Sequence, residues 1–181
     1  MGLLSHTFNN LNDLLIHELG DLYDAENRLT EALPKMAEAA KSQELKMAFQ
    51  DHLRETEQHV HRLEQVFSRM GCEPKRETCP AMKGLIAEGE QMISSTGDDK
   101  VRDAGLIGAA QRVEHYEMAA YGTARSFAQQ LGMSEIAQIL QQTLDEEGEA
   151  DKKLTRIAES SVNTFSPQGM AAGQKSSAMH A

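Results

Sequence analysis

The sequence predicts an all-α protein built around four long helices, and three observations lead to that prediction. Apolar residues recur at the three- and four-residue spacing of amphipathic helices through most of the 181-residue chain. Aromatic residues make up only 4% and Trp is absent, so Leu, Ile, Ala and Met must fill the core, which suits close helix packing better than a sheet. Two tight breaks and one long central connection indicate a four-helix bundle with a single crossover.

The first two predicted helices form a hairpin. Leucines at helical spacing from Leu11 to Leu33 predict a helix over about residues 6–40, with Pro34 as a kink point. The periodic pattern breaks around residues 41–43. A second helix then runs to about residue 70, where Gly71 is expected to end it.

The second half of the chain repeats this layout after a long crossover at residues 71–98. Cysteines, prolines and glycines punctuate the crossover, and a short extra helix is predicted near residues 82–93. A third long helix should span about residues 98–131, with Asp98 or Asp99 as its N-cap and Gly132 after its end. Ser134 can cap a fourth helix that runs to about residue 159.

These elements predict one bundle domain over residues 1–160. Residues 161–181 are dominated by Gly, Ser, Gln and Ala without periodicity, and we expect a disordered tail there.

Charge and composition narrow the classes of partner. The formal net charge is −10 and no basic patch is visible, which argues against a nucleic-acid partner. No apolar run approaches the roughly 20 residues that a membrane-spanning helix needs, and no signal-peptide pattern is present, so no membrane association is expected. Cys72 and Cys79 match neither a disulfide framework nor a zinc pattern, which favours the reducing cytoplasm.

Glutamates occur on stripes of these helices that should otherwise be apolar. Residues three, four and seven positions away from each of them are mainly Leu, Ala, Val, Met and Tyr. A buried, unpaired carboxylate costs several kcal/mol or takes up a proton, and a bound cation removes both objections. The glutamates with this pattern are Glu26, Glu114, Glu117 and Glu147.

The positions of the glutamates along the hairpins support the same interpretation. Glu26 lies 16 residues before the first turn near residue 42, and Glu55 lies 13 after it. Glu117 and Glu147 each lie 15 residues from Gly132. Equal counts from the turn of an antiparallel hairpin mean equal height, so these carboxylates should meet near the middle of the bundle.

The second helix is expected to add an imidazole. Glu55 and His59 are four residues apart on one face and border the apolar stripe, although Asp51 and Arg62 also adjoin Glu55. His52 extends the same row and is a rival ligand. Carboxylates with imidazole suit iron or manganese. The sequence therefore predicts two transition-metal ions, iron or manganese, held by Glu26, Glu55, His59, Glu114, Glu117 and Glu147.

A solvated or ion-paired glutamate is the simpler interpretation of any one of these positions. Glu18 also has apolar neighbours, but it lies two turns from Glu26, at the wrong height for Glu55. What favours a metal site is the combination: inward carboxylates on four helices at matching heights.

The same segments resemble a known family. DLYDAENRLTEALPKMA, HLRETEQHVHRLEQVF, VEHYEMAAYGTA and TLDEEGEADKKL, one from each long helix, are similar to the YciE/YciF-type ferritin-like stress proteins. The resemblance covers about residues 5–160. It implies a ferritin-like bundle, a homodimer, a dimetal centre and a link to stress responses.

A more distant likeness to rubrerythrin shows where this chain departs from a common dimetal pattern. Rubrerythrin carries a Glu, a Glu-x-x-His, a Glu-x-x-Glu and a second Glu-x-x-His on its successive helices. Here the second-helix pair is spaced by four residues, and Ala150 stands where the second His would be. Asp151, on the face of Glu147, is the alternative at that position, so the coordination of the second metal stays open.

Two functional hypotheses follow from these patterns. In the first, the protein is a stress-related dimetal carboxylate protein that reacts with peroxide or oxygen. In the second, it is a non-enzymatic, stress-induced structural or metal-binding protein. A homodimer is the expected assembly in either case.

Overall fold

The structure is a computed structural model that describes residues 6–164, and its regular elements there are all helical, which confirms the all-α prediction. The long helices are α1 (Leu11–Ala39), α2 (Gln43–Arg69), α4 (Asp99–Gln130) and α5 (Ser134–Ile157). The shorter α3 (Pro80–Ser94) lies in the crossover between α2 and α4, and a π-helical turn (Ala158–Val162) extends α5.

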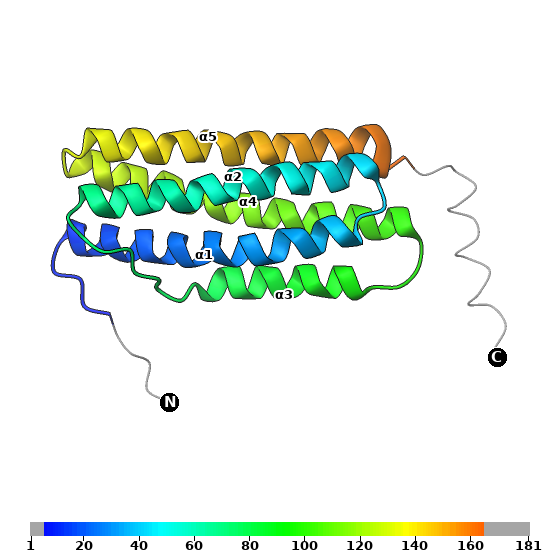
Figure 1. Ribbon diagram of the computed structural model, residues 1–181, viewed down its shortest axis with the longest axis horizontal. Coiled ribbons are helices and arrows are strands. Elements are labelled where there is room, and N and C mark those ends of the chain that lie inside the picture. The colour runs from blue at the N-terminus through cyan, green and yellow to red at the C-terminus, as the bar shows by residue number, and fades with distance from the viewer. Residues whose placement is uncertain (1–5, 165–181) are drawn as a thin grey trace, which may run out of the picture.

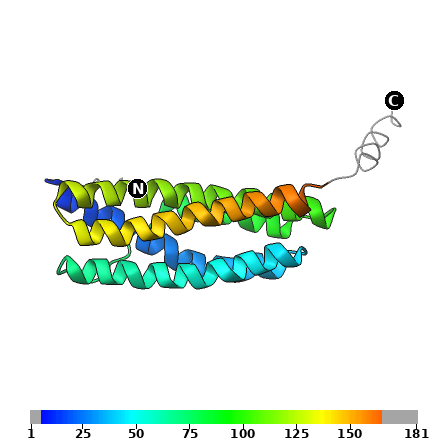
Figure 2. The same cartoon turned by 90° about the horizontal axis from the view of Figure 1, so that it is seen from above.

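The long helices pack as two antiparallel hairpins laid side by side (Figure 1). Helix α1 packs against α2 and α4, and α5 packs against α4 and α2, so the four helices enclose one interior. Helix α3 packs along α1 and α4, as the view in Figure 1 shows at the lower edge of the bundle. Figure 2 shows the seam between α2 and α5 from above, and α3 lies at the opposite edge of the bundle, the lower edge in Figure 1.

Local capping explains most helix ends. Ser42 caps α2 and Asp98 caps α4 through their side chains, and Gly71 and Gly132 adopt positive φ just beyond α2 and α4. Two details differ from the sequence prediction. Helix α1 begins at Leu11 rather than near residue 6, because the Asn10 side chain accepts the Asp13 N–H. Ser134 is the first residue of α5 and makes no side-chain cap. Pro34 lies within α1, as the predicted range of that helix implied, and α1 continues to Ala39.

The predicted tail falls largely outside the described residues. Ser161 and Val162 belong to the π-helical turn. Residues 165–181, and residues 1–5 at the other end, lie outside the part of the chain that the structure describes.

A buried carboxylate ties the crossover to the bundle. Asp24 of α1 is 3% exposed and accepts hydrogen bonds from Arg28, from Arg76 and from the backbone N–H of Cys79. The Cys79 thiol in turn accepts the Met82 N–H at the start of α3. One aspartate therefore fixes the path of the chain into α3.

The apolar core is divided into two clusters, one towards each end of the bundle. One contains Leu29, Phe49, Leu106 and Leu154, and the other contains Leu15, Phe67, Tyr121 and Leu140, among others. On every long helix the residues between the two clusters include buried carboxylates or imidazoles. The fold thus places a polar layer at mid-height.

No helix in the described part is long and apolar enough to cross a membrane.

Candidate metal centre

Side chains from all four long helices meet in this polar layer, and each is buried. Helices α1 and α5 contribute one glutamate each, α2 contributes two histidines, and α4 contributes two glutamates. None of the six exceeds 7% exposure. They are Glu26, His52, His59, Glu114, Glu117 and Glu147.

Helical spacing explains why these side chains point inward. His52 and His59 are seven residues apart, about two turns, and share the buried stripe of α2 with Leu45, Thr56 and Leu63. Glu114 and Glu117 are one turn apart on the buried face of α4. The same apolar periodicity that builds the bundle therefore delivers the polar groups to its interior.

The six residues form two overlapping groups whose potential ligand atoms lie within 4.8 Å of one another. One group contains His52, Glu114, Glu117 and Glu147, and the other contains Glu26, His59 and Glu147. Because Glu147 belongs to both, its two carboxylate oxygens are suited to join two adjacent cations.

The contacts inside the layer are close but poorly aligned for hydrogen bonding. His59 Nδ1 lies 3.0 Å from Glu147 Oε1 and 3.4 Å from Glu26 Oε1. His52 Nε2 lies 3.4 Å from Glu114 Oε1 and 3.7 Å from Glu147 Oε2. The buried atoms without a hydrogen-bond partner include Glu26 Oε2, Glu114 Oε2, His52 Nε2, His59 Nδ1 and both oxygens of Glu117 and Glu147.

A clear hydrogen bond in the layer comes from a tyrosine. The Tyr121 hydroxyl of α4 donates to Glu26 Oε1 over 2.5 Å, and the Tyr121 side chain is itself buried. This bond satisfies Oε1 of Glu26, whereas Oε2 is buried without a hydrogen-bond partner.

Burial and mutual repulsion perturb the ionisation of the cluster. Burial raises the pKa of Glu114 to about 8, and burial together with the nearby glutamates raises the pKa of Glu117 well above its usual value. Burial alone would lower the pKa of His52, but the charge of Glu114 raises it to about 9. The pKa of His59 rises to about 11 against the same burial effect, because the carboxylates of Glu147 and Glu26 adjoin it. Without a metal, the layer retains protons to offset its buried negative charge.

The structure brings together five of the six predicted ligands. Glu55 is the exception, because it lies at the edge of the α2 stripe with 50% of its side chain exposed. Its Oε2 atom is 3.3 Å from His52 Nδ1, on the side of the ring that faces away from the cluster. His52, the rival ligand, occupies the interior position instead, and the ligand roles themselves stay predictions.

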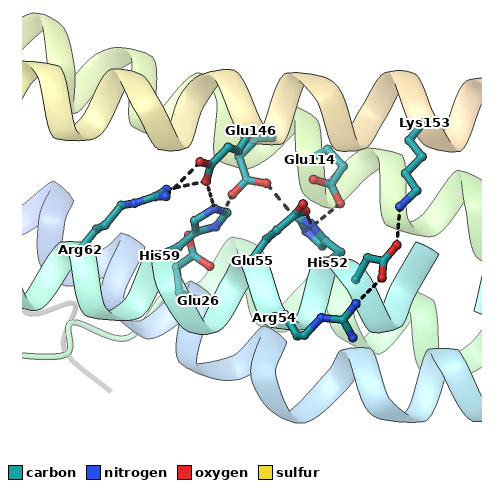
Figure 3. Close-up of polar contacts among 11 residues, drawn as sticks. Glu26, His52, Arg54, Glu55, His59, Arg62, Glu114, Glu146 and Lys153 are labelled. Atoms are coloured by element: carbon teal, nitrogen blue, oxygen red, sulfur yellow. Dashed lines mark hydrogen bonds and ion pairs between the residues drawn. The ribbon is translucent and has the colours of Figure 1, made fainter. Parts of the chain in front are cut away.

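Two further positions differ from expectation. Glu146, which the sequence pattern did not place near the cluster, accepts hydrogen bonds from Arg62 and lies 2.9 Å from His59 Nε2 (Figure 3). Asp151, the alternative ligand on α5, lies apart from the cluster, where it accepts a hydrogen bond from Gln111 and lies 3.4 Å from His115. The second imidazole therefore comes from α2, not from α5.

The donor set fits a pair of first-row transition-metal ions. It consists of carboxylate oxygens and imidazole nitrogens, which suit iron, manganese or zinc. Unpaired buried acceptors and excess negative charge are the features that a bound cation would resolve.

Fold and site together define a class of protein: a helical bundle with a carboxylate–imidazole cluster buried at mid-height. The chain belongs to the family described as "Domain of unknown function (DUF892)", whose sequence profile matches residues 10–166. This membership agrees with the resemblance to YciE/YciF-type proteins that the helix segments indicated.

The E. coli protein YciF matches nearly the whole bundle in both sequence and structure. Protein YciF of Escherichia coli K12 is 47% identical over 154 residues, which span 84% of this chain and 93% of that protein. The crystal structure of the E. coli stress protein YciF superposes with a TM-score of 0.84 at 45% identity, covering 87% of this chain and 100% of that one.

Further solved structures share the fold. YcfI of Rhodopseudomonas palustris, assigned provisionally as a structural protein, superposes with a TM-score of 0.81 at 40% identity and covers 91% of this chain and 99% of that one. A protein from Xanthomonas campestris matches at 22% identity with a TM-score of 0.64, over 83% of this chain and 92% of that one, which shows the fold alone.

Proposed function

We propose that the protein is a ferritin-like dimetal carboxylate protein that holds two iron or manganese ions and reacts with peroxide or oxygen during stress. The observation that supports this proposal is the group of buried ligand atoms without hydrogen-bond partners, drawn from four helices at one height. Such a group is unfavourable in an ion-free core and favourable around cations.

The composition of the cluster supports the ferritin-like assignment. Dimetal bundles of that class place a Glu on each of two helices and a Glu-x-x-His on each of the other two, which gives four glutamates and two histidines. Here Glu26, Glu114, Glu117 and Glu147 with His52 and His59 give the same donor set, with both imidazoles on α2. His52 thus supplies the imidazole that Ala150 does not.

Each residue has a definable task in this proposal. Bound ions of this kind supply Lewis acidity and a change of oxidation state. Glu147 spans the two groups, and Glu117 offers two free oxygens. Tyr121 fixes Glu26 through its hydroxyl. The apolar clusters above and below the layer keep bulk water from the reacting atoms.

Metal analysis combined with turnover tests this proposal. Protein reconstituted anaerobically with Fe(II) or Mn(II) should retain two ions per chain and consume hydrogen peroxide faster than the free ions. Glu147→Gln should lose metal and turnover, whereas the matched change Glu149→Gln, at an exposed position on α5, should retain both. No retained metal in the unchanged protein would contradict the proposal.

A non-enzymatic role is the second candidate, and the description of the R. palustris relative as a structural protein favours it. In that case the ions would stabilise the bundle without turnover. Chelation would then lower the melting temperature while peroxide consumption would match that of buffer containing the same ions.

We also propose a homodimer, on the strength of the family resemblance. Light scattering after gel filtration should give twice the 20.0 kDa chain mass. A mass of one chain at micromolar concentration would contradict this assembly.

A further inference from the structure

Each histidine of the cluster has one ring nitrogen inside and one outside, and each outer nitrogen meets a carboxylate. His52 Nδ1 lies 3.3 Å from Glu55 Oε2, and His59 Nε2 lies 2.9 Å from Glu146 Oε2. Both carboxylates lie on the seam between α2 and α5, partly exposed, whereas the imidazoles are buried. Figure 3 shows the two pairs along this seam.

The two rings present opposite nitrogens to the cluster. His52 directs Nε2 towards Glu114 and Glu147, and His59 directs Nδ1 towards Glu147 and Glu26. A neutral imidazole carries its proton on one nitrogen and leaves the other as the acceptor that binds a metal. An outer carboxylate that accepts the N–H therefore selects which nitrogen is free.

We propose that Glu55 and Glu146 are positioning residues that hold the two imidazoles in opposite tautomers, so that His52 Nε2 and His59 Nδ1 face the two ions. This inference rests on the proposed dimetal function and goes beyond it, because it assigns a role to two seam carboxylates and to the ring nitrogens they select. Neither carboxylate itself belongs to the groups of potential ligands.

The two carboxylates are anchored unequally. Glu146 accepts from both terminal nitrogens of Arg62 and from Gln142, and 32% of its side chain is exposed. Glu55 is 50% exposed, and His52 is its only polar side-chain contact among the described residues. The carboxylate beside His59 is therefore held in place by other side chains, whereas the carboxylate beside His52 is not. Loss of Glu146 should cost more metal affinity than loss of Glu55.

The test uses the full chain loaded with Zn(II), which is diamagnetic and accepts the same donors. Two-bond ¹H–¹⁵N correlation spectra of the histidine rings report which nitrogen binds the metal. The unchanged protein should show metal on His52 Nε2 and on His59 Nδ1. Competition with a chelator measures affinity at each site.

The variants separate positioning from general surface effects. Glu146→Gln should weaken Zn(II) binding by about 10–100-fold, the range found when a carboxylate behind a ligand histidine is removed, and should disturb the His59 ring signals. Glu55→Gln should also weaken Zn(II) binding, by a smaller factor, and should disturb the His52 ring signals. Arg62→Gln keeps Glu146 but removes the two hydrogen bonds that Arg62 donates to it. The Zn(II) affinity of this variant should lie between that of Glu146→Gln and that of the unchanged protein.

Exposed glutamates on the same helices provide matched controls. Glu57→Gln on α2 and Glu149→Gln on α5 should leave affinity and ring signals unchanged. If the unchanged protein binds two ions but Glu55→Gln and Glu146→Gln alter neither affinity nor ring nitrogens, the positioning role is wrong while the dimetal function stands. If the unchanged protein binds no ion, the proposed function and this inference both fail.

Discussion

Among the individual residues of the cluster, Glu117 has the least support from the protein itself. Glu26 has Tyr121, and Glu114 and Glu147 have imidazoles within 3.7 Å. Glu117 is fully buried and neither of its oxygens has a hydrogen-bond partner. Burial and the neighbouring glutamates raise its pKa well above the usual value, so the metal-free protein disfavours its ionised form, and a bound cation would remove that penalty.

Replacing Glu117 by an apolar residue of similar length should separate stability from binding. Glu117→Met should stabilise the metal-free protein by about 1–3 kcal/mol, because an unsatisfied buried acid is exchanged for packing atoms. The same change should abolish the rise in melting temperature on adding Zn(II). Urea unfolding with a chelator and thermal melts with Zn(II) measure the two effects.

The comparison variant for this experiment is Glu57→Met, at an exposed position of α2. It should leave both the unfolding free energy and the Zn(II) response within error of the unchanged protein. A metal-free Glu117→Met protein less stable by several kcal/mol would show that Glu117 has a structural partner in solution, against the unsatisfied state inferred here.

The sequence revealed the buried position of a residue where local helical periodicity determines it, and missed it where a long-range contact does. Apolar neighbours along one helix identified Glu114, Glu117 and Glu147, because their burial follows from helical periodicity alone. Glu146 was missed because its partner Arg62 lies 84 positions away in sequence, and local pattern carries no information on such a contact. Glu55 was placed inside because height along the hairpin was weighed above its position at the edge of the stripe.

At the scale of elements, a few charged contacts fix the path of the crossover, in addition to the apolar burial of Met82 and its neighbours in α3. Asp24 connects α1 to Arg76 and to the first turn of α3 through the Cys79 N–H. Burial would raise the pKa of Asp24, but the hydrogen bonds from Arg28, Cys79 and Arg76 lower it below its usual value. The ionised form is therefore the one that the fold requires.

Removal of this charge should loosen the crossover. Asp24→Asn should cost about 2–3 kcal/mol of unfolding free energy, as for other buried charge-assisted hydrogen bonds. Because the folded-state pKa is depressed, the stability that Asp24 provides is present above its unfolded value near 3.8 and lost as pH falls through the folded value. Urea unfolding at pH 7 and pH 3 should thus show a difference between Asp24→Asn and the unchanged protein that shrinks in acid.

The same experiment has a local readout. Amide hydrogen exchange at residues 76–83 should accelerate in Asp24→Asn while exchange at mid-helix α5 stays unchanged. Uniform acceleration across all helices would mean that the aspartate supports global stability instead of the crossover.

The turn between α1 and α2 depends on a residue from a third helix. Asp103 of α4 is 2% exposed and accepts the backbone N–H groups of Lys41 and Ser42. Asp103→Asn should destabilise the protein by about 1–2 kcal/mol, because one amide oxygen replaces two charged acceptors. Asp145→Asn, at an exposed position of α5, serves as the control in urea unfolding. Equal stability of the two variants would contradict the role of Asp103.

Helix positions were predictable to within a few residues, and part of the capping was predictable as well, since Asp98, one of the two N-caps expected for α4, does cap it. Gly71 and Gly132 mark the ends of α2 and α4 because both adopt positive φ. The start of α1 was placed too early since apolar spacing alone does not show that Asn10 caps it. The start of α3 depends on a thiol that is positioned by Asp24, a long-range contact.

At the scale of the whole molecule, a layer of charge interrupts what would otherwise be one continuous apolar core. Two apolar clusters stabilise the ends of the bundle, and the middle depends on what neutralises the carboxylates. Protons can do this in the metal-free protein and cations in the loaded one. The two forms should consequently respond to pH in opposite directions.

The metal-free protein should lose stability as pH rises through neutrality. His52 has a pKa of about 9 in the folded protein against 6.5 ordinarily, so between these values the folded state keeps a proton that the unfolded chain releases. Glu114, at about 8 against 4.5, acts with the same sign at lower pH. With a chelator present, the melting temperature should therefore fall steadily from pH 6.5 to pH 8.5.

Zn(II) should reverse this slope, because the ligands must release their protons to bind and deprotonation becomes easier as pH rises. The stabilisation on adding Zn(II) should grow from pH 6.5 to pH 8.5. His52→Gln should make the metal-free slope shallower, whereas His115→Gln, at an exposed imidazole, should leave it unchanged. A metal-free melting temperature that stays level or climbs over this range would mean that the buried layer holds no protons in solution, and the charge balance inferred for the bundle would be wrong.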